Sequence, residues 1–492
     1  MCCGNLIKSC VMADYNIIGR EYEQRILQNI CDETEAKLVA VFGRRRVGKT
    51  FLIKNFFKEN FDFFFTGSFE TPMKIQLALF ADALKKYSGV EQPVPKNWHE
   101  AFRQLEVYLA TLRKKQIVVF LDELPWMDTP KSNFLTAFSY FWNSWASTCN
   151  GLKMIICGSA TSWMLDKIIG DRGGLYGRCS RTIHVSPFSL YEVEQFLLKQ
   201  KGIKWTRYQI LEAYMIMGGI PYYLDMLEKG LPFAQNIDNL FYREGAPLRT
   251  EYDFLFRSLF KSSTMYRQVV EALSKKNKGL TLKEIKEEIN LGDGGVLSTV
   301  IDNLCKCGFI RAYSAYGKRE KGTIYQLIDL FCLYHQKFLG GQNVTDAHFW
   351  SNIKDGAKNA WAGYAFEMLC LHHIKQIRVK LGISGVLTNI CSWSIKKQTD
   401  ADGAEWDGAQ IDLLLCRADN VIDVCEMKYC KSLYTVTAAY DEKIRERNGT
   451  FEHFTKTKDA LHNVLITTYG VKRNMYSDTF NNVVTADDLF KE

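Results

Sequence analysis

The fold is decided by Val39–Thr50, which reads V-A-V-F-G-R-R-R-V-G-K-T. An apolar run, as in a buried strand, leads directly into a G-x-x-x-x-G-K-T motif at residues 43–50. The amphipathic run Phe51–Phe57 follows and predicts a helix. A phosphate-binding loop (P-loop) requires this order, because glycines let successive backbone N–H groups converge on phosphate oxygens at the positive end of a helix dipole.

Each part of this loop has an expected role. Lys49 is expected to reach the terminal phosphates of ATP, and the Thr50 hydroxyl to ligate Mg²⁺. The alternative is a surface turn that matches by chance, but the strand and helix on either side argue against it. The loop residues expected to bind the nucleotide are Gly43, Arg44, Arg45, Arg46, Val47, Gly48, Lys49 and Thr50.

A second apolar run, Gln116–Leu121, ends in the carboxylates Asp122 and Glu123. A continuous apolar run is typical of a buried parallel strand, and ligands bind at the carboxyl ends of such strands. We therefore expect Asp122 to hold Mg²⁺ and Glu123 to polarise the attacking water. A strand followed by an acidic loop is the plainer interpretation, and the P-loop upstream disfavours it.

Composition limits the class of protein. A chain of 492 residues predicts about three domains. Its 47% hydrophobic and 24% charged residues are typical of a well-packed soluble protein, and the net charge of +8 permits a nucleic-acid partner without requiring one. The 15 cysteines follow no signal-peptide pattern and many lie in apolar runs, so we expect reduced thiols, a cytoplasmic location and no membrane span.

A third buried run, Met154–Ala160, ends in small polar residues, so that Ser159 or Thr161 is a candidate γ-phosphate contact. Arg178 or Arg181, in the following glycine-rich segment, is a candidate to reach the phosphates of a neighbouring subunit. That role would require a homo-oligomer, and the alternative for both arginines is a solvated loop.

These motifs together resemble the archaeal-type ATPase family, an AAA+/STAND-like branch of P-loop ATPases. The matching stretches, in order, are GRRRVGKT, IVVFLDELPWMD, IICGSA, LYGR, PFSLYE and GGIPYYL. They cover roughly the first half of the chain. The resemblance implies an ATP-binding α/β core followed by a helical lid, which suits the helical pattern of residues 190–259.

After the lid, the pattern predicts a winged helix. Helices are expected at Tyr266–Leu273, Thr281–Ile289 and Val296–Cys305, and strands at Phe309–Tyr313 and Thr323–Leu327. The hairpin tip is basic, with Lys318, Arg319 and Lys321, so DNA contact is one interpretation. The alternative is a winged helix that only joins domains, and Asp302 on the expected recognition helix disfavours phosphate contact.

The last part of the chain begins with the helix Trp361–Leu369 and contains two strands, Ala409–Leu415 and Val421–Lys428. A three-residue loop at Ala418–Asn420 would place Asp412 opposite Glu426, and Glu426 and Lys428 share a face because side chains alternate along a strand. Two carboxylates and a lysine on one face predict a Mg²⁺ site for phosphodiester cleavage, with Glu367 completing the metal ligands. The alternative is a solvated sheet face.

This arrangement is similar to PD-(D/E)xK nucleases: an acidic helix, then I-D, then E-x-K, with Ile411 in the place of the usual Pro. The resemblance implies catalytic roles for Asp412, Glu426 and Lys428. Domain order in the archaeal-type ATPase family supports it, since a domain of this type commonly follows the winged helix there.

The sequence therefore predicts a multi-domain α/β chain. The expected parts are a tail (1–14), a P-loop NTPase core with a parallel sheet (15–190), a helical lid (191–262), a winged helix (263–345) and an α/β restriction-endonuclease-like domain (346–492). The predicted function is an ATP-driven switch coupled to Mg²⁺-dependent cleavage of nucleic acid, DNA more than RNA. The alternative is a nucleotide-regulated DNA-binding or signalling protein with a non-cleaving terminal scaffold.

Overall fold

The computed structural model describes residues 17–170, 174–175, 177–260, 262–291, 295–317, 323–341, 344–400 and 403–492. The chain forms two compact units. The first comprises the residues up to Phe42, Gly48–Gly158 and Lys167–Val185, and the second comprises Gly43–Val47, Ser159–Asp166 and Ser186–Glu492.

The first unit is built on a parallel sheet in the order β2-β3-β4-β1-β5. Its strands are β1 Lys37–Phe42, β2 Phe63–Thr66, β3 Ile117–Asp122, β4 Leu152–Gly158 and β5 Arg181–His184. Every residue of β3 and β4 is buried, as expected of parallel strands covered on both faces. The predicted parallel sheet is confirmed, and the carboxyl ends of its strands share one edge.

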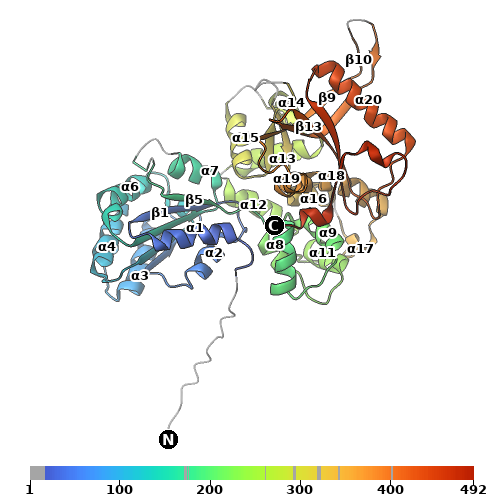
Figure 1. The fold of residues 1–492 in the computed structure, drawn as a ribbon. Coiled ribbons are helices and arrows are strands. Elements are labelled where there is room, and N and C mark those ends of the chain that lie inside the picture. The colour runs from blue at the N-terminus through green and yellow to red at the C-terminus, as the bar shows by residue number, and fades with distance from the viewer. Residues whose placement is uncertain are drawn as a thin grey trace. The chain divides into compact units, whose positions relative to one another are not determined.

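Helices surround this sheet (blue to teal in Figure 1). Their apolar faces pack on it; in α4, for example, Trp98, Phe102 and Leu105 are buried. The helices of the first unit are α1 Glu21–Asp32, α2 Lys49–Phe56, α3 Met73–Ser88, α4 Trp98–Thr111, α5 Leu124–Met127 and α6 Phe134–Ser144. The helix that the sequence predicted after the glycine loop is α2.

The second unit begins with helices, as the sequence predicted for the lid. Ser189 and Thr206 start α8 and α9 with capping boxes, in which side chain and backbone satisfy each other's hydrogen bonds. The helices up to residue 259 are α7 Thr161–Met164, α8 Leu190–Gln195, α9 Arg207–Met217, α10 Pro221–Asp225, α11 Phe233–Phe241 and α12 Glu251–Leu259.

The next segment contains the helices and hairpin that the sequence predicted. A three-stranded sheet, in the order β6-β8-β7, is antiparallel, and α14 begins at a capping box between Thr281 and Glu284. The basic tip, Lys318, Arg319 and Lys321, lies outside the described residues, so winged helix remains a prediction. The elements are α13 Ser263–Ser274, β6 Leu280–Thr281, α14 Leu282–Glu288, α15 Val296–Lys306, β7 Ile310–Tyr313, β8 Ile324–Leu327 and α16 Leu330–Phe338.

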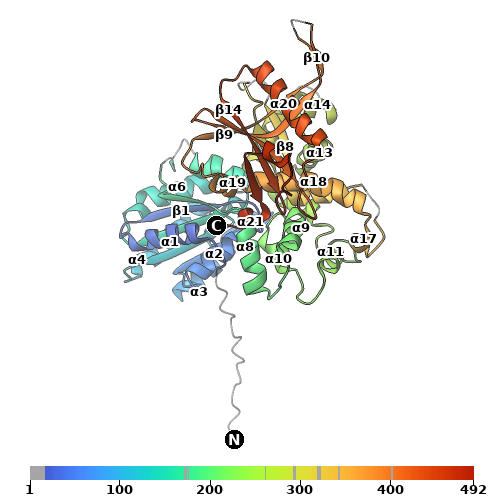
Figure 2. The same ribbon diagram turned by 45° about the vertical axis from the view of Figure 1, so that its right-hand side comes forward.

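The terminal part of the second unit holds a mixed sheet in the order β15-β14-β13-β12-β9 (orange to red in Figure 2). Strands β13, β14 and β15 run parallel, whereas β12 pairs antiparallel with β13 and β9. Phe451 of α20 packs against Trp393, Leu414 and Val424 on one face. The elements are α17 Phe349–Asn352, α18 Asp355–His372, α19 Ile374–Lys380, β9 Thr388–Ile395, β10 Gln398–Thr399, β11 Glu405–Trp406, β12 Ala409–Arg417, β13 Val421–Lys428, α20 Ala438–Thr455, β14 Ala460–Thr467, β15 Asn482–Thr485 and α21 Ala486–Leu489.

Throughout the part of the chain that the structure describes, no helix combines the length and the apolar character needed to cross a bilayer.

Candidate functional site

The glycine loop has the backbone that a phosphate-binding turn requires. Between β1 and α2 the backbone takes positive φ angles at Gly43 (145°), Arg46 (71°) and Gly48 (89°). A side chain is strained in this region, so glycine is needed at its two positions, and Arg46 carries strain of the kind found at functional sites. Gly48 stands directly before Lys49, the first residue of α2.

The two magnesium ligands predicted for the glycine-loop site, Thr50 and Asp122, are adjacent. The Thr50 hydroxyl, at the start of α2, donates a hydrogen bond of 2.9 Å to Oδ2 of Asp122 at the end of β3. Asp122 and Lys49 are both buried, with 4% and 5% of their surface exposed. A hydroxyl and a carboxylate already in contact are a fitting pair of oxygen donors for Mg²⁺. The sequence placed Thr50 at the end of the glycine loop and Asp122 at the end of a strand, and the fold brings them together.

Glu123 is held in an unusual backbone conformation. Its φ is 46°, in the left-handed region that glutamate rarely adopts, and its N–H donates to Oδ1 of Asp122 at 3.0 Å. Gly67, which follows β2, lies so close that an added Cβ would come within 2.7 Å of the Glu123 carbonyl oxygen. The turn that presents Glu123 therefore depends on the small size of Gly67.

In the first unit, Lys49 and Arg20 both lie close enough to His184 to act on its charge. The pKa of His184, the last residue of β5, is lowered by burial of its ring and then by the charges of Lys49 and Arg20. Arg20 is itself 6% exposed and lies in the left-handed region at the start of α1. This cationic environment suits a polyphosphate. The Gly19-Arg20-Glu21 stretch directly before α1 is the local sequence signal for this arginine.

The arginines of the glycine loop make ion pairs within the second unit. Arg44 forms a double contact with Asp329, one arm of which is 3.3 Å, and both side chains are buried. Asp329 also caps α16 by accepting the Cys332 N–H at 2.7 Å. The loop is therefore attached to the start of a helix 285 residues away in sequence.

Arg46 makes a second, similar contact. Its guanidinium lies 2.7 Å from Oε2 of Glu251, the first residue of α12, while the Tyr223 hydroxyl donates to Oε1 at 2.8 Å. Burial raises the pKa of the Glu251 carboxyl, and Arg46 opposes that rise. The Arg46 guanidinium also stacks over the Tyr222 ring at 4.2 Å. These buried charges are each satisfied by a specific partner.

The remaining predicted phosphate contacts are less defined. Ser159 is buried directly after β4, and the buried Thr161 hydroxyl has no hydrogen-bond partner among the described residues. Arg178 is exposed. Arg181 is the first residue of β5, at the opposite end from the strand's carboxyl edge, and lies 3.8 Å from Glu33. Which of these residues contacts a nucleotide stays a prediction.

The β12–β13 hairpin has the predicted loop and register. The strands end and begin at Arg417 and Val421, which leaves the three-residue loop Ala418–Asn420, with Asn420 at φ 62°. Leu413 pairs with Cys425, so the register continues toward Asp412 opposite Glu426. On its other side, β12 is irregular against β9 between Ile411 and Leu414. A bulge of this kind re-aims a side chain.

Glu426 is surrounded by positive charge. Lys428 lies 2.9 Å from Oε1 of Glu426, and Arg447 of α20 contacts Oε2. These two cations lower the pKa of the Glu426 carboxyl below its usual value, against the effect of burial. Both carboxylate oxygens are thereby occupied, and sequence reasoning had no local signal for Arg447.

Glu367 of α18 interacts electrostatically with the other residues predicted for this site. Its pKa is raised to about 8, first by burial and then by the negative charge of Asp412, with a smaller contribution from Glu426 and opposition from Lys428. The four side chains predicted for this site therefore interact electrostatically. Among the described residues, however, no group of three or more His, Cys, Asp or Glu side chains is arranged to hold a metal ion. With Glu426 held by Lys428 and Arg447, the present arrangement does not fit a three-carboxylate metal site.

The three-stranded sheet of the same unit lies beside the exposed Asp412 and the half-buried Glu367. Arg311 of β7 and Gln326 of β8, joined by a hydrogen bond of 2.7 Å, line a cavity of about 30 Å³ together with these two acids. Burial lowers the pKa of Arg311, and Asp412 is among the groups that oppose this. The cavity has room for a water molecule or two and is too small for a phosphodiester.

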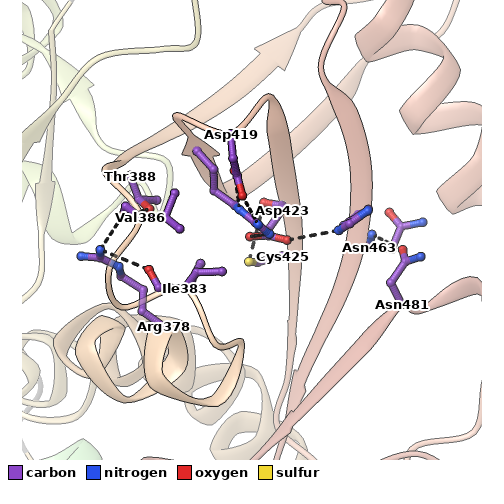
Figure 3. Close-up of polar contacts among 11 residues, drawn as sticks. Arg378, Ile383, Val386, Thr388, Asp419, Asp423, Cys425, Asn463 and Asn481 are labelled. Carbon is purple, nitrogen blue, oxygen red and sulfur yellow. Dashed lines mark hydrogen bonds and ion pairs between the residues drawn. The ribbon is translucent and has the colours of Figure 1, made fainter.

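A separate acidic group lies at the turn end of the hairpin. Asp423 is 1% exposed and lies near Asp419, and Arg417 contacts both. Figure 3 shows Asp419 and Asp423 together, with Asn463 of the neighbouring strand beyond them. Burial raises the pKa of Asp423, and Arg417 opposes the rise. Because Arg417 bridges the two carboxylates, the group is best understood as a structural part of the turn.

The expected recognition helix, α15, has an acid in an ion pair. Asp302 is exposed and lies 2.7 Å from Lys306 of the same helix, and Lys306 also lies 2.6 Å from Asp166. This contact neither tests nor supports DNA binding.

Comparison with known proteins identifies the N-terminal part. Residues 17–227 match a family model described as an ATPase domain predominantly from Archaea. The segment contains the glycine loop, Asp122 and Glu123 within an ATPase-type P-loop domain, of the kind that binds a nucleotide.

One relative and two solved structures are also similar to this chain. An uncharacterised protein of Methanocaldococcus jannaschii is 27% identical over 325 residues, which is 65% of this chain and 68% of that protein. A Walker-type ATPase of Pyrococcus abyssi has a TM-score of 0.47 and 18% identity, covering 65% of this chain and 96% of its own. The ORC2 protein of Aeropyrum pernix, solved with ADPNP and ADP, has a TM-score of 0.41 and 12% identity, covering 73% and 96%.

Proposed function

We propose that this chain binds and hydrolyses ATP at its glycine loop. The observation that supports the proposal best is the contact between Thr50 and Asp122, which lie 72 positions apart in sequence and meet at the carboxyl edge of the parallel sheet. The match to an ATPase domain over residues 17–227 supports it independently.

Phosphate binding, metal binding and water activation are assigned to different residues. Backbone N–H groups of the loop and the Lys49 ammonium bind the phosphates, while Thr50 and Asp122 would hold Mg²⁺. The bound ion would neutralise charge that develops on the phosphate oxygens. Glu123, presented by a strained turn, orients the attacking water and accepts its proton.

The nucleotide state is proposed to act on the second unit through Arg44 and Arg46. Their ion pairs connect the loop to Asp329 at the start of α16 and to Glu251 at the start of α12. A bound phosphate that changes the backbone of the loop would alter these contacts. ATP would then shift the second unit between two conformations only if those two conformations bind ATP with different affinity.

Substitution Glu123→Gln tests the hydrolytic part. We expect ATP turnover to fall by about 100-fold or more, because the amide cannot accept a proton, while ATP binding is retained. Turnover is followed by phosphate release and binding by a fluorescent nucleotide. Glu100→Gln, an exposed carboxylate on α4, is the matched control. Undiminished hydrolysis in the Glu123 variant would assign water activation to another residue.

A second candidate function concerns the terminal sheet: Mg²⁺-dependent cleavage of nucleic acid by Asp412, Glu426 and Lys428. The effect of Asp412 and Glu426 on the pKa of Glu367 favours it, because carboxylates that repel each other at close range attract a cation. The pairing of Glu426 with Arg447 favours the alternative, a scaffold that does not cleave.

A plasmid-nicking assay with Mg²⁺ separates these two alternatives. Cleavage that disappears in both Asp412→Ala and Lys428→Ala supports the nuclease assignment. Cleavage indifferent to both substitutions would discredit these residues, and no cleavage by the wild type under any nucleotide condition would favour the scaffold.

A further inference from the structure

Two thiols of the terminal sheet lie side by side. The sulfur atoms of Cys391, on β9, and Cys416, on β12, are 3.3 Å apart. The register explains this proximity: Cys391 pairs with Leu414, and Cys416 lies two residues further along the same face. A disulfide bond of about 2.05 Å therefore requires only a short approach of the two side chains.

The two thiols are also accessible. Both cysteines are half-buried, and both line an open cavity of about 640 Å³ together with Ser314, Gly317 and Asn389. The two sulfur atoms are within hydrogen-bonding distance, and this contact lowers the pKa of the Cys416 thiol while raising that of the Cys391 thiol. By contrast, burial raises the pKa of Cys157, Cys332 and Cys370, which lie within the apolar core.

We propose that Cys391 and Cys416 are a redox modification site that forms a reversible disulfide with a hydroperoxide as oxidant. The Cys416 sulfur attacks the peroxide, the O–O bond breaks, and Cys416 becomes a sulfenic acid while the other oxygen leaves as an alcohol or water. The Cys391 sulfur then attacks Cys416, the S–O bond breaks, and the hydroxyl leaves with the Cys391 proton as water. Two thiols and one hydroperoxide thus give one disulfide, one alcohol or water, and one water.

The proposed disulfide would join β9 to β12, and these two strands contact different parts of the second unit. β9 is the edge strand, and the carbonyl of its Ser392 accepts the Tyr316 N–H at 2.8 Å. β12 carries Asp412, four residues before Cys416. The disulfide would therefore fix the strand that contacts the β7–β8 segment to the strand of the candidate acidic site. The proposal does not depend on cleavage by that site.

The test uses the full reduced chain with one equivalent of hydrogen peroxide, followed by alkylation, proteolysis and mass spectrometry. We expect one peptide joined through Cys391 and Cys416, lighter by two hydrogens than the two thiol peptides and separated again by dithiothreitol. In Cys391→Ser the joined peptide is lost, and dimedone traps a sulfenic acid on Cys416. The control Cys430→Ser, which removes another half-buried cysteine, retains the joined peptide.

Because a serine variant can misfold, the wild type is also oxidised in urea. Selective pairing in the native protein, replaced by mixed pairing in urea, supports the proposal. If both thiols are still alkylated after peroxide treatment of the native protein, or if other cysteines pair equally often, the proposal is wrong.

Discussion

The two candidate phosphate sites differ in how their carboxylates are satisfied. In the first unit, Asp122 contacts a neutral hydroxyl, that of Thr50, and the backbone N–H of Glu123. In the terminal sheet, Glu426 contacts two cations, Lys428 and Arg447. A carboxylate paired with a neutral donor remains available to a metal ion, whereas one paired with two cations must lose a partner first.

The comparison teaches that a short motif does not define a site by itself. Both motifs have the spacing that their chemistry needs, yet Arg447 and Arg311 come from elements distant in sequence and change the charge of the second site.

Lys49→Ala should lower ATP turnover by about 100-fold or more, because the variant loses the cation that stabilises the transferred phosphate. Lys428→Ala, the equivalent change in the terminal sheet, should keep ATP turnover within about twofold of the wild-type rate, because Lys428 lies outside the ATP site. Phosphate release measures both. Equal losses in the two variants would contradict the separation of the two sites.

Acid should destabilise the second unit through His373 at the end of α18, the helix that carries Glu367. Its ring is neutral: Nδ1 donates to the Leu369 carbonyl at 2.8 Å, and Nε2 accepts the Leu190 N–H at 3.0 Å. Burial lowers the pKa of His373 to about 4. The unfolded chain therefore binds the proton first, and stability is lost as pH falls from about 6.5 toward 4, by about 3 kcal/mol.

Urea unfolding at pH 7, 6, 5 and 4 measures this loss. His373→Gln should flatten the pH dependence in this window, while His99→Gln, a surface histidine of α4, should leave it unchanged. The same slope in the wild type and in His373→Gln would assign the acid sensitivity to other groups, such as His335 and His372, whose pKa values burial also lowers.

Arg447→Ala should destabilise the terminal sheet by about 2 kcal/mol, because it leaves the half-buried Glu426 with one cation in place of two. Arg445→Ala is the matched control on the same helix, since Arg445 is 76% exposed in its pair with Asp441. Thermal unfolding measures the difference. In the nicking assay, greater Mg²⁺-dependent cleavage by Arg447→Ala would show that Arg447 restrains the site.

Gly67→Ala should reduce ATP turnover by about tenfold, because the new methyl group displaces the backbone of Glu123 and misplaces the catalytic carboxylate. Gly449→Ala, on α20 with open space around it, is the control. ATP affinity should change little in both. A Gly67→Ala variant with wild-type turnover would indicate that the turn has room to adjust.

Much of the fold was predictable because its signals are local. Buried runs such as Ile117–Leu121 predict parallel strands, and the Thr281–Glu284 spacing predicts the capping box that begins α14. The three-residue loop of the β12–β13 hairpin followed from the turn residues at 418–420. Each of these features depends on residues within a few positions of one another.

The partners of the site residues were not predictable. Arg44 meets Asp329, and Glu426 meets Arg447, through packing of elements that no spacing in the sequence connects. The position of Arg311 beside Asp412 likewise depends on how the β6–β8 sheet lies on the terminal sheet. A single sequence contains no periodicity that reports such contacts.

The length of the hairpin loop has a wider consequence. Side chains alternate along β13, so one residue added within Ala418–Asn420 would shift the register by one position and move Glu426 and Lys428 to the opposite face. Asp412 would then oppose Cys425, and Arg447 would lose its acid. Relatives in which the register is shifted by one residue are therefore expected to lack this acidic group, however well the E-x-K letters are preserved.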